Sequence, residues 1–168
     1  MKNKNILWTL VSVVGVVGVI VSLFLNSWSM MIGDEAAQTI GMFGSFEEAT
    51  IKLFNGVGDK TFAGLWSVLV YIFAIVLVVA VVVGIILMFV KTNKKNKKTI
   101  ELIAKICKFF AIISTILILV CGCMNCIANN VAGKLTEIVY KVVANEGFYI
   151  LAVGSVLASL GYTMASKN

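Results

Sequence analysis

The chain has 168 residues, of which 60% are hydrophobic and 13% are charged, and its formal net charge is +6. Soluble domains contain about 45–50% apolar and about 25% charged residues, so this composition excludes an ordinary soluble domain. The sequence contains no His, no Arg and no Pro. It therefore lacks the commonest general base, the side chain that clamps phosphate in bidentate fashion and any proline that would break a helix.

Four long stretches without a charge divide the chain. They lie between Lys4 and Asp34, Lys60 and Lys91, Lys108 and Lys134, and Glu146 and Lys167, and they contain 29, 30, 25 and 20 residues. About 20 apolar residues in a helix cross a hydrocarbon core of about 30 Å, so each stretch predicts one span, at about 6–25, 63–90, 109–128 and 148–165. The predicted fold class is all-α: a four-helix transmembrane bundle that forms a single integral membrane domain over residues 1–168.

Lysines set the predicted orientation, because their excess in short loops marks the cytoplasmic side. The loop 91–108 contains seven of them: Lys91, Lys94, Lys95, Lys97, Lys98, Lys105 and Lys108. Placing this loop and both termini inside puts ten lysines and one acid there, and four lysines and seven acids outside. We therefore predict a cell-membrane protein with cytoplasmic N- and C-termini. The cluster from Lys91 to Lys98 is interpreted as topogenic and attractive to anionic lipid; it lacks the interleaved aromatic residues that stack nucleic acid bases.

The first span resembles the start of a secretory signal peptide, but its apolar core of about 20 residues is longer than the 7–15 of a signal. No small-x-small cleavage site follows at residues 26–28. We expect this segment to be retained as a helix.

The first outer segment, residues 26–62, is the largest predicted piece outside the membrane. The capping box from Ser45 to Glu48 and the apolar residues after it predict a short amphipathic helix over about 46–54. Asp34 is a candidate cap for a further helical turn beginning at Glu35. The glycines of the segment argue against a long strand.

The second outer segment, residues 129–147, carries apolar residues at helical spacing: Leu135, Ile138, Val139, Val142 and Val143. This pattern predicts an amphipathic helix that lies on the outer membrane surface or packs against another element. The alternative is a simple extension of the third span past Gly133. Together the two segments add short amphipathic extracytoplasmic helices to the predicted fold.

No catalytic, cofactor or metal site is predicted. Cys121, Cys123 and Cys126 lie together in the third span, but at about 100° per residue one straight helix cannot turn all three thiols toward one ion. We interpret them, with Cys107, as small packing residues; a disulfide or metal shared between subunits is the alternative. The polar residues within the spans are not ionisable, which argues against an enzyme and against an ion-coupled transporter.

Small residues recur four apart in the first and fourth spans, a spacing that lets helices in lipid approach closely. The candidates for helix packing or oligomerisation are Gly15, Gly18, Ser22, Gly154, Ala158, Ser159 and Gly161. They pack either within one four-helix monomer or between subunits.

One resemblance concerns architecture. Four spans, a larger first outer loop, Trp28 after the first span and the sequence Gly64-Leu65-Trp66 resemble the claudin-type tetraspan pattern. That pattern continues with two loop cysteines, which this chain lacks, and here Gly64-Leu65-Trp66 directly adjoins the second span. The resemblance covers four residues and is an analogy of architecture, without membership in that family.

These observations predict a multi-pass membrane protein without enzymatic activity that acts by helix–helix assembly, as a homo-oligomer in the lipid bilayer. A second hypothesis is an oligomeric pore of the holin-like or large-pore kind, with Ser67, Tyr71, Ser114, Thr115 and Asn125 as candidate lining residues. A third is an accessory or immunity-type subunit that binds a protein partner through the acidic segment 26–62. No nucleic acid partner is expected.

Overall fold

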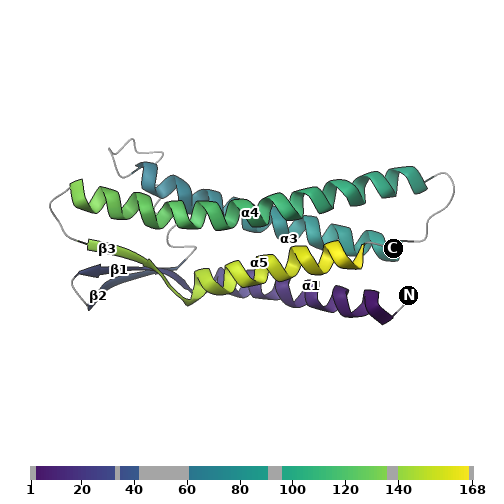
Figure 1. Cartoon of the computed structure of the whole chain (residues 1–168), viewed down its shortest axis with the longest axis horizontal. Coiled ribbons are helices and arrows are strands. Elements are labelled where there is room, and N and C mark those ends of the chain that lie inside the picture. The colour runs from purple at the N-terminus through teal and green to yellow at the C-terminus, as the bar shows by residue number, and fades with distance from the viewer. Residues whose placement is uncertain (1–2, 33–34, 42–60, 91–95, 136–139, 167–168) are drawn as a thin grey trace.

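The computed structural model describes residues 3–32, 35–41, 61–90, 96–135 and 140–166. In chain order these residues form α1 (Asn3–Ser22), β1 (Asn26–Ile32), β2 (Glu35–Gly41), α3 (Thr61–Phe89), α4 (Lys97–Leu135), β3 (Tyr140–Ala144) and α5 (Glu146–Ala165). Figure 1 shows the helices lying side by side, with the three strands at one end of the bundle.

Three of the four described helices are long and apolar enough to cross a membrane: α3 over Leu65–Phe89, α4 over Lys97–Ala128, and α5. The apolar part of α1, Ile6–Ser22, is shorter than these. The chain is therefore a multi-pass helical membrane protein. Helix α4 has 39 residues, about 58 Å at 1.5 Å per residue, so it is longer than a hydrocarbon core, and it begins at Lys97 inside the segment predicted as a loop.

The helices form two pairs. Helix α1 packs along α5, and α3 packs along α4, while the contacts between the pairs are fewer. Figure 1 shows that both chain termini lie at one end of the bundle, together with the end of α3 and the start of α4. The sheet lies at the opposite end.

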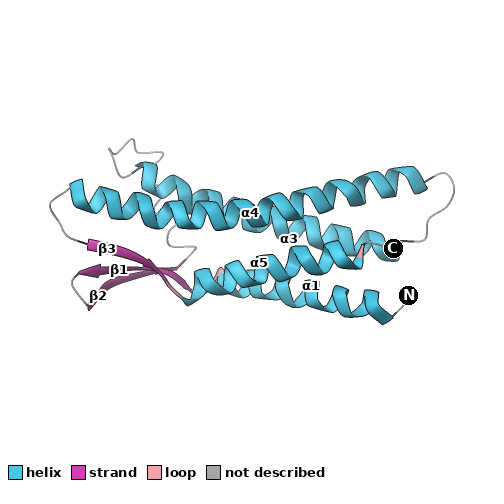
Figure 2. Ribbon diagram, in the orientation of Figure 1, coloured by secondary structure: helices cyan, strands magenta, loops and turns pink. Residues whose placement is uncertain are grey.

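The sheet joins the two segments predicted to lie outside the membrane. Its strand order is β2-β1-β3, and β1 is antiparallel to both neighbours. Ser29 in the middle strand lies opposite Thr39 of β2 and Val143 of β3. Figure 2 distinguishes these strands from the helices. Because β3 immediately precedes α5 and β1 follows α1, the sheet links the start of α5 to the segment after α1.

Two predicted helices of these segments are wrong. Residues 35–41, expected to begin a helical turn at Glu35, form β2, and the glycine-rich segment supports two strands of seven residues each. The helix expected over 135–143 is replaced by the end of α4 at Leu135 and by strand β3. Val142 and Val143 are β-branched and suit a strand, and β1 supplies the backbone partners. The alternative, an extension of the third span through this stripe, is not seen either, because α4 passes Gly133 by only two residues and residues 140–144 form β3. The predicted helix at 46–54 lies outside the described residues.

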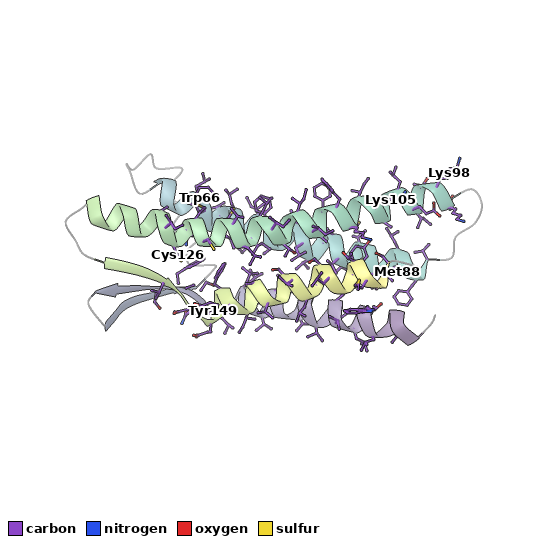
Figure 3. The ribbon with its side chains drawn as sticks, in the orientation of Figure 1. Trp66, Met88, Lys98, Lys105, Cys126 and Tyr149 are labelled. Carbon is purple, nitrogen blue, oxygen red and sulfur yellow. The ribbon has the colours of Figure 1, made fainter. Side chains whose placement is uncertain are left out.

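The distribution of polarity is the reverse of that in a soluble protein. Polar side chains are buried between the helices, among them Ser12, Ser22, Ser114, Asn125 and Ser155. Large apolar side chains face outward on every helix, for example Leu7, Val79, Phe109 and Val153, each more than half exposed. Lipid tails solvate apolar groups and leave polar groups unsatisfied. This pattern therefore agrees with lipid as the solvent of the bundle, whose side chains are drawn in Figure 3.

Candidate functional site

The contact between α1 and α5 is made by glycines. A Cβ atom on Gly15 would lie 2.7 Å from the Gly154 carbonyl oxygen, and one on Gly154 would lie 2.9 Å from the Val19 nitrogen. A Cβ on Gly161 would lie 2.8 Å from the Ser12 Cα. Ordinary carbon contacts need about 3.5–4.0 Å, so the two backbones approach as closely as they do only because these side chains are absent.

The remaining small residues surround this contact in one chain. The Ser12 hydroxyl donates to the Ala158 carbonyl across the two helices, at 2.8 Å. The hydroxyls of Ser22 and Ser159 donate to carbonyls of their own helices, and Gly18 lies beside the Gly154 Cα with room for a methyl group. The structure thus places these residues at or near the contact of α1 with α5 within one chain.

The residues considered for a pore wall lie between helices of one chain. The Ser67 hydroxyl of α3 donates to the Asn125 Oδ1 atom of α4 at 3.0 Å, and both side chains are buried. The Thr115 hydroxyl donates to the Ala111 carbonyl at 3.0 Å and lies 3.1 Å from the Ser155 carbonyl of α5. Ser114 is buried, and Tyr71 is partly buried against the hydrophobic core. These polar groups connect α3 to α4 and α4 to α5.

Tyr162 ties the two helix pairs together at the end where the termini lie. Its side chain is fully buried, and its hydroxyl donates to the Ala104 carbonyl of α4 at 3.1 Å. Its ring lies against Gly84 of α3, where a Cβ would come within 2.6 Å of a ring carbon. One residue of α5 therefore contacts both helices of the other pair, a role that no feature of the sequence pattern indicated.

The sheet is fixed to the bundle through aromatic rings. Trp28 of β1 and Phe148 of α5 are buried, and their ring centroids are 4.9 Å apart. The Phe148 ring also lies over Gly122 of α4, where a Cβ would overlap it. Because these rings bring together a strand and two helices, the sheet is held in a defined position relative to the bundle.

Hydrogen bonds from Asn145 add to this junction. Its backbone N–H donates to the Ser27 carbonyl at 2.9 Å, and its side-chain amide donates to the Ser29 hydroxyl. Its own carbonyl accepts from the N–H groups of Phe148 and Tyr149 at the start of α5. The first turn of α5 and the middle strand are thus joined by backbone and side-chain bonds.

The four cysteines are free. Cys107 and Cys121 are buried, Cys126 is partly buried and Cys123 is exposed on the outer side of α4. In the described part of the chain, no group of three or more His, Cys, Asp or Glu side chains could hold a metal ion.

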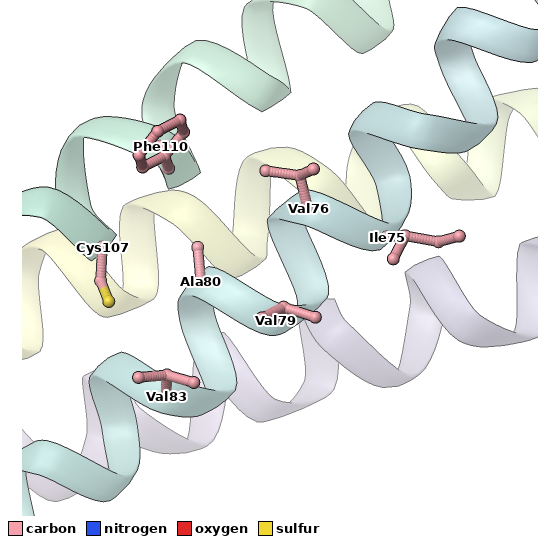
Figure 4. A pocket seen from close by; sticks show the side chains of 7 residues that line it. All are labelled: Ile75, Val76, Val79, Ala80, Val83, Cys107 and Phe110. Carbon is pink, nitrogen blue, oxygen red and sulfur yellow. The ribbon is translucent and has the colours of Figure 1, made fainter.

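An apolar groove runs between α3 and α4. It has a volume of about 340 Å³ and is lined by Ile75, Val76, Val79, Ala80, Val83, Cys107 and Phe110. Figure 4 shows Cys107 and Phe110 on α4 and the other lining side chains on α3, with Val76 and Ala80 directed toward α4. The lining offers no charged group that would orient a polar ligand.

The end of α4 away from the sheet is basic. Figure 3 shows Lys98 and Lys105 there, and both side chains are exposed. Lys97 lies 3.9 Å from Glu101 one turn further on, in an exposed pair that contributes little to stability. The other lysines of the topogenic cluster, Lys91, Lys94 and Lys95, lie outside the described residues.

The candidate site is therefore a surface with three parts: the sheet at one end of the bundle, the exposed lysines of α4 at the other end, and the outward-facing apolar side chains of the helices between them. Comparison of the chain with models of protein families, with curated proteins and with solved structures found no match.

Proposed function

We propose that this protein is a non-enzymatic membrane protein that acts by assembly with other polypeptides, in the first place with further copies of itself. The observation that carries the proposal is the fixed attachment of the sheet, through the Trp28–Phe148 ring contact and the bonds of Asn145. Binding residues are commonly presented by a rigid scaffold. The absence of His from the sequence further disfavours acid–base catalysis.

The proposed topology has four membrane crossings. Helix α1 packs along α5 and exposes an apolar face that includes Leu7, Leu10, Val14 and Val17. A helix that shares the contact surface of a spanning helix and exposes only such side chains is most stable in the same hydrocarbon layer. Four crossings also place both termini on one side, in agreement with their position at one end of the bundle.

The basic end, with Lys97 and Lys98, is proposed to face the cytoplasm and the sheet to face outward, because lysine excess is retained inside. Fusion of alkaline phosphatase or a fluorescent protein after the last residue tests this orientation. A cytoplasmic C-terminus leaves the phosphatase inactive and the fluorescent protein bright. The opposite pair of results contradicts the proposed orientation.

Self-assembly is tested by counting photobleaching steps of singly labelled full-length protein in proteoliposomes. The proposal expects two or more steps in most particles, and a step number that persists as the lipid-to-protein ratio is raised tenfold. Native mass spectrometry from mild detergent provides an independent count. Single steps at every ratio, together with only monomer mass, contradict assembly with copies of the same chain.

Binding of a different protein through the segment 26–62 stays a prediction. Deleting the whole segment is not a clean test, because it contains β1, the middle strand of the sheet. Neutralising the acids of this segment, Asp34, Glu35, Glu47, Glu48 and Asp59, leaves the strand backbone in place. Loss of a co-purifying partner from this variant supports an accessory role.

A further inference from the structure

The face of α4 that points away from the other helices carries an unbroken heptad pattern. Eight side chains recur at alternating spacings of four and three residues: Leu102, Ile106, Phe109, Ile113, Ile116, Val120, Cys123 and Ile127. Seven of them are exposed and Ile113 is partly exposed. The opposite face of the helix, with Ala111 and Ile118, is buried in the bundle. We call this stripe the outer seam.

The a positions of the outer seam match those of a parallel two-stranded coiled coil. In the register with Leu102 at position d, the a positions are all β-branched: Ile106, Ile113, Val120 and Ile127. The d positions are Leu102, Phe109, Ile116 and Cys123. β-Branched residues at a combined with Leu at d favour two strands; the a positions meet this condition, and Leu102 meets it at d. Helix pairs in membranes commonly adopt the same left-handed crossing, so the seam is shaped for a second helix of the same kind.

With Lys105 at the level of the headgroups, lipid tails do not cover the end of the seam at Leu102. From Lys105 to Ile127 the helix advances about 33 Å, which matches a hydrocarbon core of about 30 Å and places Lys105 at the level of the headgroups. Leu102 lies one turn beyond Lys105 and is 59% exposed. At that level its apolar surface meets water and headgroups, a cost that a neighbouring helix removes and a lipid tail does not.

The charges beside the seam also fit a second copy. Copies of one chain insert in the same orientation, so their α4 helices run parallel. In such a two-fold contact the a and d residues meet their own equivalents, and each g residue lies opposite an e residue of the other copy. In that arrangement Lys105, at position g, lies opposite Phe110 of the other copy at position e, which permits a cation–π contact. Lys98 lies opposite Ile103 in the same way. No lysine faces a lysine across the seam among these residues.

We propose that two copies of this chain associate in parallel through the outer seam, with the Cys123 residues of the two copies adjacent at the two-fold axis. This inference rests on the proposed self-assembly and names its contact surface.

Disulfide cross-linking of full-length protein in native membranes tests the contact directly. Copper phenanthroline oxidises two adjacent thiols to a disulfide, with loss of two electrons and two protons to the oxidant. We expect a covalent dimer of the unmodified chain and its loss in Cys123→Ser. In the Cys123→Ser background, Val120→Cys on the seam restores the dimer. Val153→Cys on α5, whose side chain is 60% exposed, is the matched control off the seam and does not.

A second measurement does not depend on thiol chemistry. The double variant Ile116→Ala/Val120→Ala removes outward-facing side chains, so its fold is retained. Förster transfer between labelled copies in liposomes is expected to show roughly tenfold weaker dimerisation, because close carbon contacts are lost from both copies. The control Val153→Ala/Leu160→Ala truncates two comparably exposed residues of α5 and leaves the dimerisation constant unchanged.

The outcomes separate the inference from the proposed function. Cross-linking at Cys123 and weakening by the seam variant together support the seam. If copies still associate while neither Cys123 nor Val120→Cys cross-links and the alanine variant is unaffected, the seam is refuted and self-assembly stands. If no association is found by any of these measurements, both are refuted, and the seam is then covered by lipid.

Discussion

The substitution Gly15→Ala tests whether the bundle depends on close approach of α1 and α5. The added Cβ would lie 2.7 Å from the Gly154 carbonyl oxygen and closer still to the Ala158 backbone nitrogen, so the helices must separate locally by at least about 1 Å to restore an ordinary contact. A gap of that size removes up to about half of the dispersion energy of each contact around it. It also stretches the bond from Ser12 to Ala158, 2.8 Å in the native chain, beyond the length of a hydrogen bond.

The expected cost follows from these two losses. Overpacking of a well-packed contact destabilises by about 1–3 kcal/mol, and a hydrogen bond between membrane helices contributes about 0.6 kcal/mol. The better helix propensity of Ala offsets about 0.5–1 kcal/mol. We therefore expect Gly15→Ala to lower the free energy of unfolding by about 1–3 kcal/mol, measured by reversible unfolding in mixed micelles with increasing denaturing detergent.

Gly18→Ala is the matched control, three residues further along the same helix. A Cβ at Gly18 would lie 3.5 Å from the Gly154 Cα, an ordinary contact distance. This variant is expected to unfold within about 0.5 kcal/mol of the native chain, or to be slightly more stable. Equal destabilisation by the two substitutions would refute the argument from close approach.

Three other substitutions test the remaining ties. Phe148→Ala leaves a cavity beside Trp28 and should cost about 3–5 kcal/mol, with a red shift of tryptophan fluorescence as the ring becomes solvated; an unchanged spectrum and stability would contradict the described junction. Tyr162→Phe keeps the ring but removes the hydrogen bond to the Ala104 carbonyl, so the free energy of unfolding should fall by about 0.5–1.5 kcal/mol. An unchanged free energy of unfolding would show that this bond contributes nothing to stability. Asn125→Ala removes the acceptor for the Ser67 hydroxyl and should cost about 0.6–2 kcal/mol, while leaving any conductance in planar bilayers unchanged; altered conductance would favour the pore hypothesis.

The helices could be predicted because lipid imposes a simple requirement on the sequence. A span needs about 20 residues without charge, and each of the four long charge-free stretches overlaps one of the four described helices. The ends of the helices follow a weaker rule. Helix α4 begins at Lys97 and includes Lys105 and Lys108. A helix can include such lysines because their long side chains reach the headgroups.

The sheet could not be predicted because its stability comes from partners distant in sequence. Strand β3 pairs with β1, which lies more than 100 residues earlier. Taken alone, the spacing of Leu135, Val142 and Val143 is that of an amphipathic helix, and β-branched residues only weakly favour a strand. The hydrogen bonds to Ser29 and its neighbours decide between the two, and no local pattern reveals them.

The small and polar residues show where sequence reasoning reaches its physical limit. In a hydrocarbon layer every polar group is directed away from lipid tails, and small residues are placed where something approaches closely. Both rules identify residues such as Gly15, Ser67 and Asn125, but neither rule predicts which group each of them contacts. A hydroxyl that avoids lipid can face water in a pore or an amide on the next helix, and the two cases have the same sequence. The 3.0 Å bond from the Ser67 hydroxyl to the Asn125 Oδ1 atom is a partner that only the folded arrangement of α3 and α4 reveals.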